Sequence, residues 1–309
     1  MIEARELTKR YGDKTVVDNL SFTVKPGEVT GFLGPNGAGK STTMRMIVGL
    51  DAPTRGSVTV NGRAYAKQKA PLHEIGVLLE AKAVHPGRSA FNHLMALAYT
   101  HGIPRRRVDE VIELAGLTSV AGKRVGAFSL GMGQRLGIAS ALLGDPATIM
   151  LDEPVNGLDP EGVLWVRNLL RQLADEGRAV MLSSHLMSEM ALVADHLVII
   201  GRGRLLADTT VDDFTQQAGG GGVKVATDEA AKLRSLLAGP DVTITSSSAE
   251  ELLVSGRDAR EIGAIAAQHG VALHELTPQA VSLEAAFMDL TRDVVEYQSA
   301  PAGTERKAA

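Results

Sequence analysis

The sequence lacks cysteine, long apolar runs and an excess of basic charge. Without cysteine the chain can form no disulfide, no thiolate metal site and no catalytic cysteine, so the cytosol is its simplest compartment. No run reaches the roughly 18 apolar residues of a membrane span, and the charged N-terminus is unlike a signal peptide. We therefore expect a polypeptide that does not cross a membrane by itself. A formal net charge of -4 argues against a nucleic-acid partner, whose phosphates would require a basic surface.

Residues 30–43 contain the pattern G-x-x-x-x-G-K-[ST], directly after an apolar segment and before a helical one. In a P-loop of this kind, backbone N–H groups turn inward and cradle phosphates at a helix N-terminus. Lys40 is expected to reach the β- and γ-phosphates, and Ser41 to offer its hydroxyl to Mg²⁺. A glycine-rich connection without a ligand is the alternative, but the complete motif in the required order argues against it. The predicted nucleotide-binding residues are Gly34, Pro35, Asn36, Gly37, Ala38, Gly39, Lys40, Ser41 and Thr42.

A buried-type strand over residues 147–151 leads into two acids, Asp152 and Glu153. Adjacent strand residues point to opposite faces, so the two carboxylates can take separate roles. Asp152 is expected to bind Mg²⁺, and Glu153 to polarise the water that attacks the γ-phosphate. Acid pairs at strand ends are usually solvated surface, but the apolar strand and the upstream P-loop favour a catalytic pair here.

Three further side chains stand where they could meet a nucleotide. His185 follows an apolar strand at 179–182 and could contact the γ-phosphate, although such a histidine is commonly structural. Ser129 stands at an N-cap before an apolar helix, where free N–H groups bind anions; an ordinary capped helix is the alternative. Tyr11 precedes the first long strand, and its ring could stack on adenine or simply pack against the protein.

The order of the predicted elements describes an α/β core, for which we set the bounds 1–217. A strand at 75–79 ends at Glu80, and helical spacing from about 86 to 145 predicts a helical insertion. A hairpin at 198–207 closes the domain. An antiparallel β layer on the core is predicted from three short β-rich pieces, residues 15–24, 29–33 and 57–60.

A glycine-rich linker at 218–222 precedes a second, smaller domain at 223–297. Its segments follow the order strand, helix, strand, strand, helix, strand, which predicts an α+β unit of ferredoxin-like type. It contains no phosphate loop and no acid pair at a strand end, so we expect it to serve assembly. The polar tail 298–309 is expected to be disordered.

In this order the motifs resemble those of the ATP-binding subunits of ABC transporters, over about residues 1–215. The resemblance implies a P-loop NTPase core of ABC type that binds ATP and Mg²⁺ and hydrolyses ATP. The matching segments are Walker A at 34–42, the signature at 128–135, Walker B at 149–153, the D-loop at 157–159, the H-loop at His185, the A-loop at Tyr11 and the Q-loop position at Glu80.

The same resemblance implies a homodimer with two ATP molecules at its interface. Each chain would lend Ser129, Gly131 and Met132 to the ATP that Lys40 of the other chain holds, and Asp159 of the D-loop would lie nearby. A separate integral-membrane permease would use the energy of hydrolysis. The chain would then be cytoplasmic and peripheral, on the inner face of the cell membrane.

Two departures from the common family pattern suggest export. Glu80 stands where most members have glutamine, and the signature reads Phe-Ser-Leu-Gly-Met where Leu-Ser-Gly-Gly-Gln is commonest. Both are similar to the drug- and antibiotic-resistance branch, with its bacitracin and daunorubicin resistance ATPases. The alternatives are a soluble ABC ATPase acting on ribosomes or DNA, and a nucleotide-dependent regulator without turnover. A single P-loop without sustained heptads argues against the first, and Glu153 with His185 argues against the second.

Overall fold

The computed structural model describes residues 1–80, 84–217, 222–240, 242–246, 248–279 and 282–292. They form two compact units, the first of residues 1–208 with 291–292 and the second of residues 209–290. The predicted tail, and the predicted linker apart from Gly222, lie outside the described residues.

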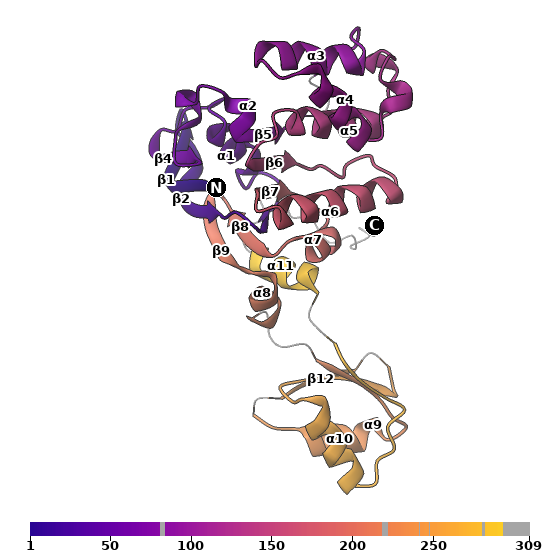
Figure 1. Ribbon diagram of the computed structural model, residues 1–309. Helices are drawn as coiled ribbons and strands as arrows, with labels where there is room; N and C mark the ends of the chain where they lie inside the picture. The colour runs from indigo at the N-terminus through magenta and orange to yellow at the C-terminus, as the bar shows by residue number, and fades with distance from the viewer. Residues whose placement is uncertain (81–83, 218–221, 241, 247, 280–281, 293–309) are drawn as a thin grey trace, which may run out of the picture. The chain divides into compact units, whose positions relative to one another are not determined.

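A six-stranded sheet forms the centre of the first unit, in the order β5-β6-β7-β3-β8-β9 (Figure 1). The pairs β5–β6, β6–β7, β7–β3 and β3–β8 are parallel, so these strands end at one common edge. All residues of β3 and β7 are buried, as in strands covered on both faces. The strands are β3 (Val29–Leu33), β5 (Ile75–Leu78), β6 (Thr148–Asp152), β7 (Ala179–Ser183), β8 (His196–Gly201) and β9 (Arg204–Thr210).

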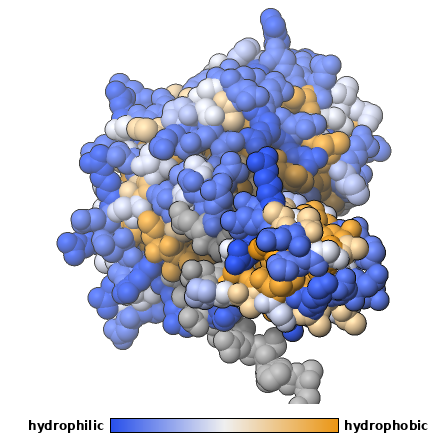
Figure 2. Space-filling view, turned by 90° about the horizontal axis from the view of Figure 1, so that it is seen from below, coloured by the Kyte–Doolittle hydropathy of each residue, from blue (hydrophilic) through white to orange (hydrophobic). Residues whose placement is uncertain are grey.

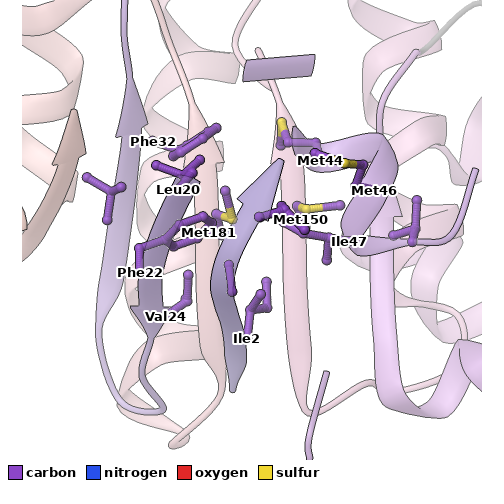
Figure 3. Packing of buried hydrophobic residues seen from close by; sticks show 14 of the residues in the cluster. Ile2, Leu20, Phe22, Val24, Phe32, Met44, Met46, Ile47, Met150 and Met181 are labelled. Carbon is purple, nitrogen blue, oxygen red and sulfur yellow. The ribbon is translucent and has the colours of Figure 1, made fainter. Parts of the chain in front are cut away.

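The antiparallel layer is a three-stranded sheet in the order β2-β1-β4. Residues 29–33, which the sequence assigned to this layer, instead form β3 of the central sheet, because a run that is buried at every position suits a parallel strand covered on both faces. The layer packs on the helix that follows the P-loop, α1 (Lys40–Ile47), and Figure 3 shows Leu20 and Phe22 of the layer in one cluster with Met44 and Ile47 of α1. The rings of Phe22 and Phe32 stack with centroids 5.4 Å apart. Each such buried side chain contributes about 1.5–3 kcal/mol, so this core holds α1 firmly. The strands are β1 (Ile2–Tyr11), β2 (Lys14–Val24) and β4 (Arg55–Val60).

The central strand of this layer, β1, is absent from the sequence prediction. The outward positions of β1 carry many charges. Its alternation of buried and exposed residues changes phase because Glu6 takes a left-handed backbone conformation, with φ 48°. The register with both neighbouring strands shifts around that residue. Ile2 and Ala4 are therefore buried before the shift and Leu7 after it, a pattern that a simple period of two does not detect.

The helical insertion consists of α3 (Ala90–Thr100), α4 (Arg105–Leu114) and α5 (Leu130–Leu142), inside the predicted range. Figure 1 shows these helices together at one end of the unit. Helix α5 packs on β5, and a Cβ added at Gly137 would lie 2.6 Å from Leu78. The other helices of the unit are α2 (Pro71–Glu74), α6 (Pro160–Asp175), α7 (Met187–Val193) and the 3₁₀ turns Tyr65–Lys67, Thr118–Val120 and Val125–Ala127.

The second unit contains a four-stranded antiparallel sheet in the order β11-β12-β10-β13. The last segment of the predicted order is a strand that the sequence pattern sets at 271–276. In the structure this strand begins only at Glu275, because Val271 is buried by packing against the core and not by strand pairing. The ferredoxin-like assignment remains a prediction. The elements are α8 (Val211–Gln217), β10 (Val223–Ala226), α9 (Ala230–Leu237), β11 (Thr243–Ser246), β12 (Glu251–Ser255), α10 (Ala259–Gln268), β13 (Glu275–Pro278) and α11 (Leu283–Thr291).

Polar residues dominate the face of the molecule seen in Figure 2, and apolar residues lie there in separate patches. Among the residues that the structure describes, every helix is too short or too polar to traverse a bilayer.

Candidate functional site

The P-loop connects β3 to α1 through backbone conformations that favour glycine. Gly37 and Gly39 are left-handed, with φ 82° and 103°. A Cβ at Gly39 would lie 2.8 Å from the carbonyl oxygen of Val16, and a Cβ at Gly34 would lie 2.4 Å from that of Ile200. The loop therefore has no room for side chains at these places. Helix α1 begins at Lys40 without a side-chain cap, so its first N–H groups point into the loop.

The Lys40 side chain folds back over this loop. Its ammonium donates to the carbonyl oxygens of Gly34, at 2.5 Å, and Pro35, at 3.3 Å. Burial lowers the pKa of Lys40, while the carboxylates of Glu153 and Asp152 act in the opposite direction. The cation is thus held between the loop and the two acids, where a phosphate could replace its carbonyl partners.

Ser41 and Asp152 meet at the edge of the sheet. The Ser41 hydroxyl lies 3.4 Å from Oδ2 of Asp152, and Ser183 at the end of β7 donates a short hydrogen bond to Oδ1. Hydroxyl and carboxylate oxygens are ligands that suit Mg²⁺, which usually keeps several waters and needs few protein groups. This pair therefore fits a magnesium ion, although the described residues include no cluster of three or more acidic, histidine or cysteine ligands.

Glu153 is fixed by contacts at its backbone and at its side chain. Its N–H donates to the Ser183 hydroxyl at 3.0 Å, and its carbonyl accepts from Gln134 of α5 at 2.9 Å. Its backbone is left-handed, with φ 50°, which is uncommon outside glycine and asparagine. The carboxylate lies 2.7 Å from Nδ1 of His185. The structure thus brings together Lys40, Ser41, Asp152, Glu153 and His185.

Ser183 and Gln134 hold the acid pair, and sequence reasoning assigned neither a role. Ser183 pairs in register with Asp152 across β6 and β7, which lie side by side although about 30 residues separate them in the chain. The sequence signal that could have indicated Ser183 is its place at the end of the apolar strand before His185. Gln134 lies within the predicted signature, and its contact with Glu153 depends on how α5 packs.

The signature lies against the D-loop of the same chain. Ser129 caps α5 by accepting from the N–H of Met132 at 3.2 Å, as predicted for an N-cap. A Cβ at Gly131 would lie 3.0 Å from the carbonyl oxygen of Gly157. Asp159 caps α6 and accepts from Gly162 at 2.8 Å. Among the described residues, no hydrogen bond joins Ser129 or Gly131 to the P-loop.

Glu80 and Tyr11 are the last two of the predicted site residues. Glu80 is exposed and lies two residues beyond Leu78, where β5 ends, so it belongs to the following loop and not to the strand end. Tyr11 ends β1, and 48% of its surface is exposed. An exposed ring of this kind is open to stacking, in contrast to a core aromatic.

Comparisons with known proteins identify a matching family and several relatives. Residues 17–156 match the family described as ABC transporter, and residues 221–284 match a domain of unknown function (DUF8746). The bacitracin transport ATP-binding protein BcrA of Bacillus licheniformis is 44% identical over 220 residues, 70% of this chain and 72% of that protein. The linearmycin resistance ATP-binding protein LnrL of Bacillus subtilis is 34% identical over 305 residues, 94% of this chain and 98% of that protein. A solved ATP binding subunit of an ABC transporter superposes with a TM-score of 0.65 at 29% identity, covering 70% of this chain and 92% of that one.

Proposed function

Because the chain belongs to the ABC transporter family as an ATP-binding ATPase, we propose that it powers a separate membrane permease that exports an antibiotic or another hydrophobic compound. The family and the α/β fold predicted from the sequence are confirmed. One observation carries the hydrolytic part of the proposal. The carboxylate of Glu153 lies 2.7 Å from His185, at the edge where Lys40, Ser41 and Asp152 converge.

The proposed chemistry follows from the roles that these side chains can take. Backbone N–H groups of the P-loop and the Lys40 ammonium hold the phosphates. Ser41 and Asp152 would hold Mg²⁺, which when bound would offset negative charge on the β- and γ-phosphates. Glu153 orients the attacking water and accepts its proton, while His185 fixes the carboxylate and faces the γ-phosphate.

The proposed dimer follows from the place of the signature. Ser129, Gly131 and Met132 make no hydrogen bond to their own P-loop among the described residues, yet they stand at a helix start that suits an anion. In a twofold homodimer each signature would approach the ATP of the other chain. Each of the two sites would then combine Lys40 of one chain with Ser129 of its partner.

The permease and the exported compound are inferred from relatives. BcrA is named for bacitracin transport and LnrL for linearmycin resistance, and LnrL matches along nearly its whole length. Glu80 and the Phe-Ser-Leu-Gly-Met signature point to the same branch. We therefore place the chain at the inner face of the membrane, docked on a permease of about six spans.

Reconstitution tests this proposal. The full chain and the permease encoded beside it would be placed in lipid vesicles, and phosphate release and movement of a bacitracin-like peptide would be measured together. We expect peptide movement only with ATP and Mg²⁺, and none with Lys40→Ala, which lacks the phosphate-binding ammonium. Peptide movement that persists with Lys40→Ala, or phosphate release that the permease never affects, would contradict the proposal.

A further inference from the structure

Helices α5 and α6 begin side by side, at the signature and at the D-loop. A Cβ at Gly131 would lie 3.0 Å from the carbonyl oxygen of Gly157, and a Cβ at Gly157 would overlap the Leu130 side chain. The caps of the two helices, Ser129 and Asp159, are both exposed. The two helix starts are therefore in contact with each other, and both are open to a partner chain.

A second contact joins the same two helices further along. The guanidinium Cζ of Arg135 on α5 lies 4.5 Å from the ring centroid of Trp165 on α6, a cation–π contact between two half-buried side chains. Each of these residues lies six positions beyond the cap of its helix, Ser129 or Asp159, which is about 9 Å along the helix axis. This contact thus fixes the angle between the helices at a distance from their starts.

The end of α4 fixes the orientation of Arg135. Its Nη1 donates to the carbonyl oxygen of Ala115, the C-cap of α4, at 3.2 Å. A cation is favourable there because the last carbonyl groups of a helix have no partner inside the helix. Arg135 is therefore held by α4 while it covers the Trp165 ring, and it joins three helices.

Both helices keep other anchors when this contact is removed. Helix α6 buries Val166 and Leu170, and α5 buries Leu136 and packs on β5. Gln134 also ties α5 to the carbonyl oxygen of Glu153 in its own chain, at 2.9 Å. Removing the Trp165 ring should therefore leave the fold and the acid pair in place and loosen only the angle between α5 and α6.

We propose that Trp165 is a positioning residue of the composite ATP site: with Arg135 it holds the signature against the D-loop, so that both approach the partner's ATP as one body. The proposal rests on the proposed function, in particular on its dimer, and deepens it. Because the signature would act on the ATP of the other chain, Trp165 should influence that ATP and not the ATP held by its own P-loop.

Two mixed dimers of the full chain, isolated with two different tags, test this direction. The first pairs a Lys40→Ala chain with a Trp165→Ala chain, and the second pairs a chain carrying both changes with the parent. Each dimer keeps one Lys40, which meets an unaltered signature in the first dimer and the signature of a Trp165→Ala chain in the second. We expect about 10-fold lower ATPase activity in the second dimer than in the first. The first should match the dimer of parent and Lys40→Ala chains.

Fluorescence tests the contact itself, because Trp165 is the only tryptophan of the chain. Arg135→Gln removes the cation from the ring, so it should change the emission of Trp165. In place of Trp165→Ala in the second dimer, Arg135→Gln should also lower ATPase activity about 10-fold. Added to Trp165→Ala in the same chain, it should cause little further loss, because the contact is already absent. Trp165→Phe keeps an aromatic ring and should restore most of the activity.

The matched control is Arg105→Gln, because Arg105 of α4 makes a contact of the same kind with Phe91 of α3, at 5.3 Å from the ring centroid. In place of Trp165→Ala in the second dimer, it should leave ATPase activity unchanged. Equal activity of the two Trp165→Ala dimers would show that Trp165 serves packing alone and would overturn the proposal. So would an unchanged Trp165 emission in Arg135→Gln. An inactive dimer of parent and Lys40→Ala chains would instead refute the composite site of the proposed function, and this proposal with it.

Discussion

Helices α1 and α5 of the first unit both have N-termini that we propose to bind phosphate. They differ in how their own residues satisfy the free backbone N–H groups there. Helix α1 begins after the left-handed Gly39 with no side-chain cap, whereas α5 begins after Ser129, whose hydroxyl accepts from Met132. The first start therefore leaves N–H groups for a ligand, and the second already satisfies one of its own. The start of α1 adjoins the side chains proposed to bind phosphate and metal and to activate water. The start of α5 has only a cap, and in the proposed dimer its anion would be the ATP of the partner chain.

The largest expected effect is at the complete site. Glu153→Gln keeps the size of the side chain but cannot accept a proton, so turnover should fall on the order of 100-fold or more while ATP affinity is kept. An ATP-bound dimer should accumulate, which gel filtration with labelled ATP would detect. Glu161→Gln, in the first turn of α6, is the control and should turn over like the parent. Undiminished turnover in Glu153→Gln would refute its role as the base.

A smaller effect is expected at the start of α5, where Ser129 has both a structural and a proposed catalytic role. Ser129→Ala should lower the free energy of unfolding by about 1 kcal/mol through loss of the cap. Ser89→Ala is a matched control, because Ser89 caps α3 by accepting from Asn92 at the same 3.2 Å. Both variants should lose similar stability in urea unfolding. Only Ser129→Ala should also lose ATPase activity, about 10-fold. An equal loss of ATPase activity in Ser89→Ala would show that Ser129 acts only as a helix cap.

The smallest effect on nucleotide binding is expected from the second unit. Its sheet carries no P-loop, and Lys224 is already paired with Glu251 and Glu275, at 3.1 and 2.9 Å. Removing residues 223–309 should leave mononucleotide affinity unchanged within about 2-fold, because no proposed ligand group is lost. Sedimentation and pull-down should show weaker dimerisation or weaker permease association. Equal association with and without the segment would contradict the predicted assembly role.

What the sequence could predict depended on how local the signal was. The P-loop and the pair Asp152–Glu153 are contiguous, and their pattern alone indicates their roles. Ser183 supports both acids only because β7 lies beside β6, and that adjacency comes from strand order in the sheet. Strand β1 escaped prediction because the backbone at Glu6 shifts its phase. The sequence pattern therefore could not predict contacts between distant segments or local departures from regular strand geometry.

The trans arrangement of the two helix starts is the central claim, and mixed dimers test it most directly. Lys40→Ala chains and Ser129→Arg chains, each inactive alone, would be combined, and the mixed dimers isolated with two different tags. One intact site should form from Lys40 of the second chain and Ser129 of the first, so ATPase activity should return. Mixed dimers of the parent with a chain carrying both changes should stay inactive, because each site then lacks one group. Activity in this second set and none in the first would place Ser129 and Lys40 at the same ATP within one chain and contradict the account.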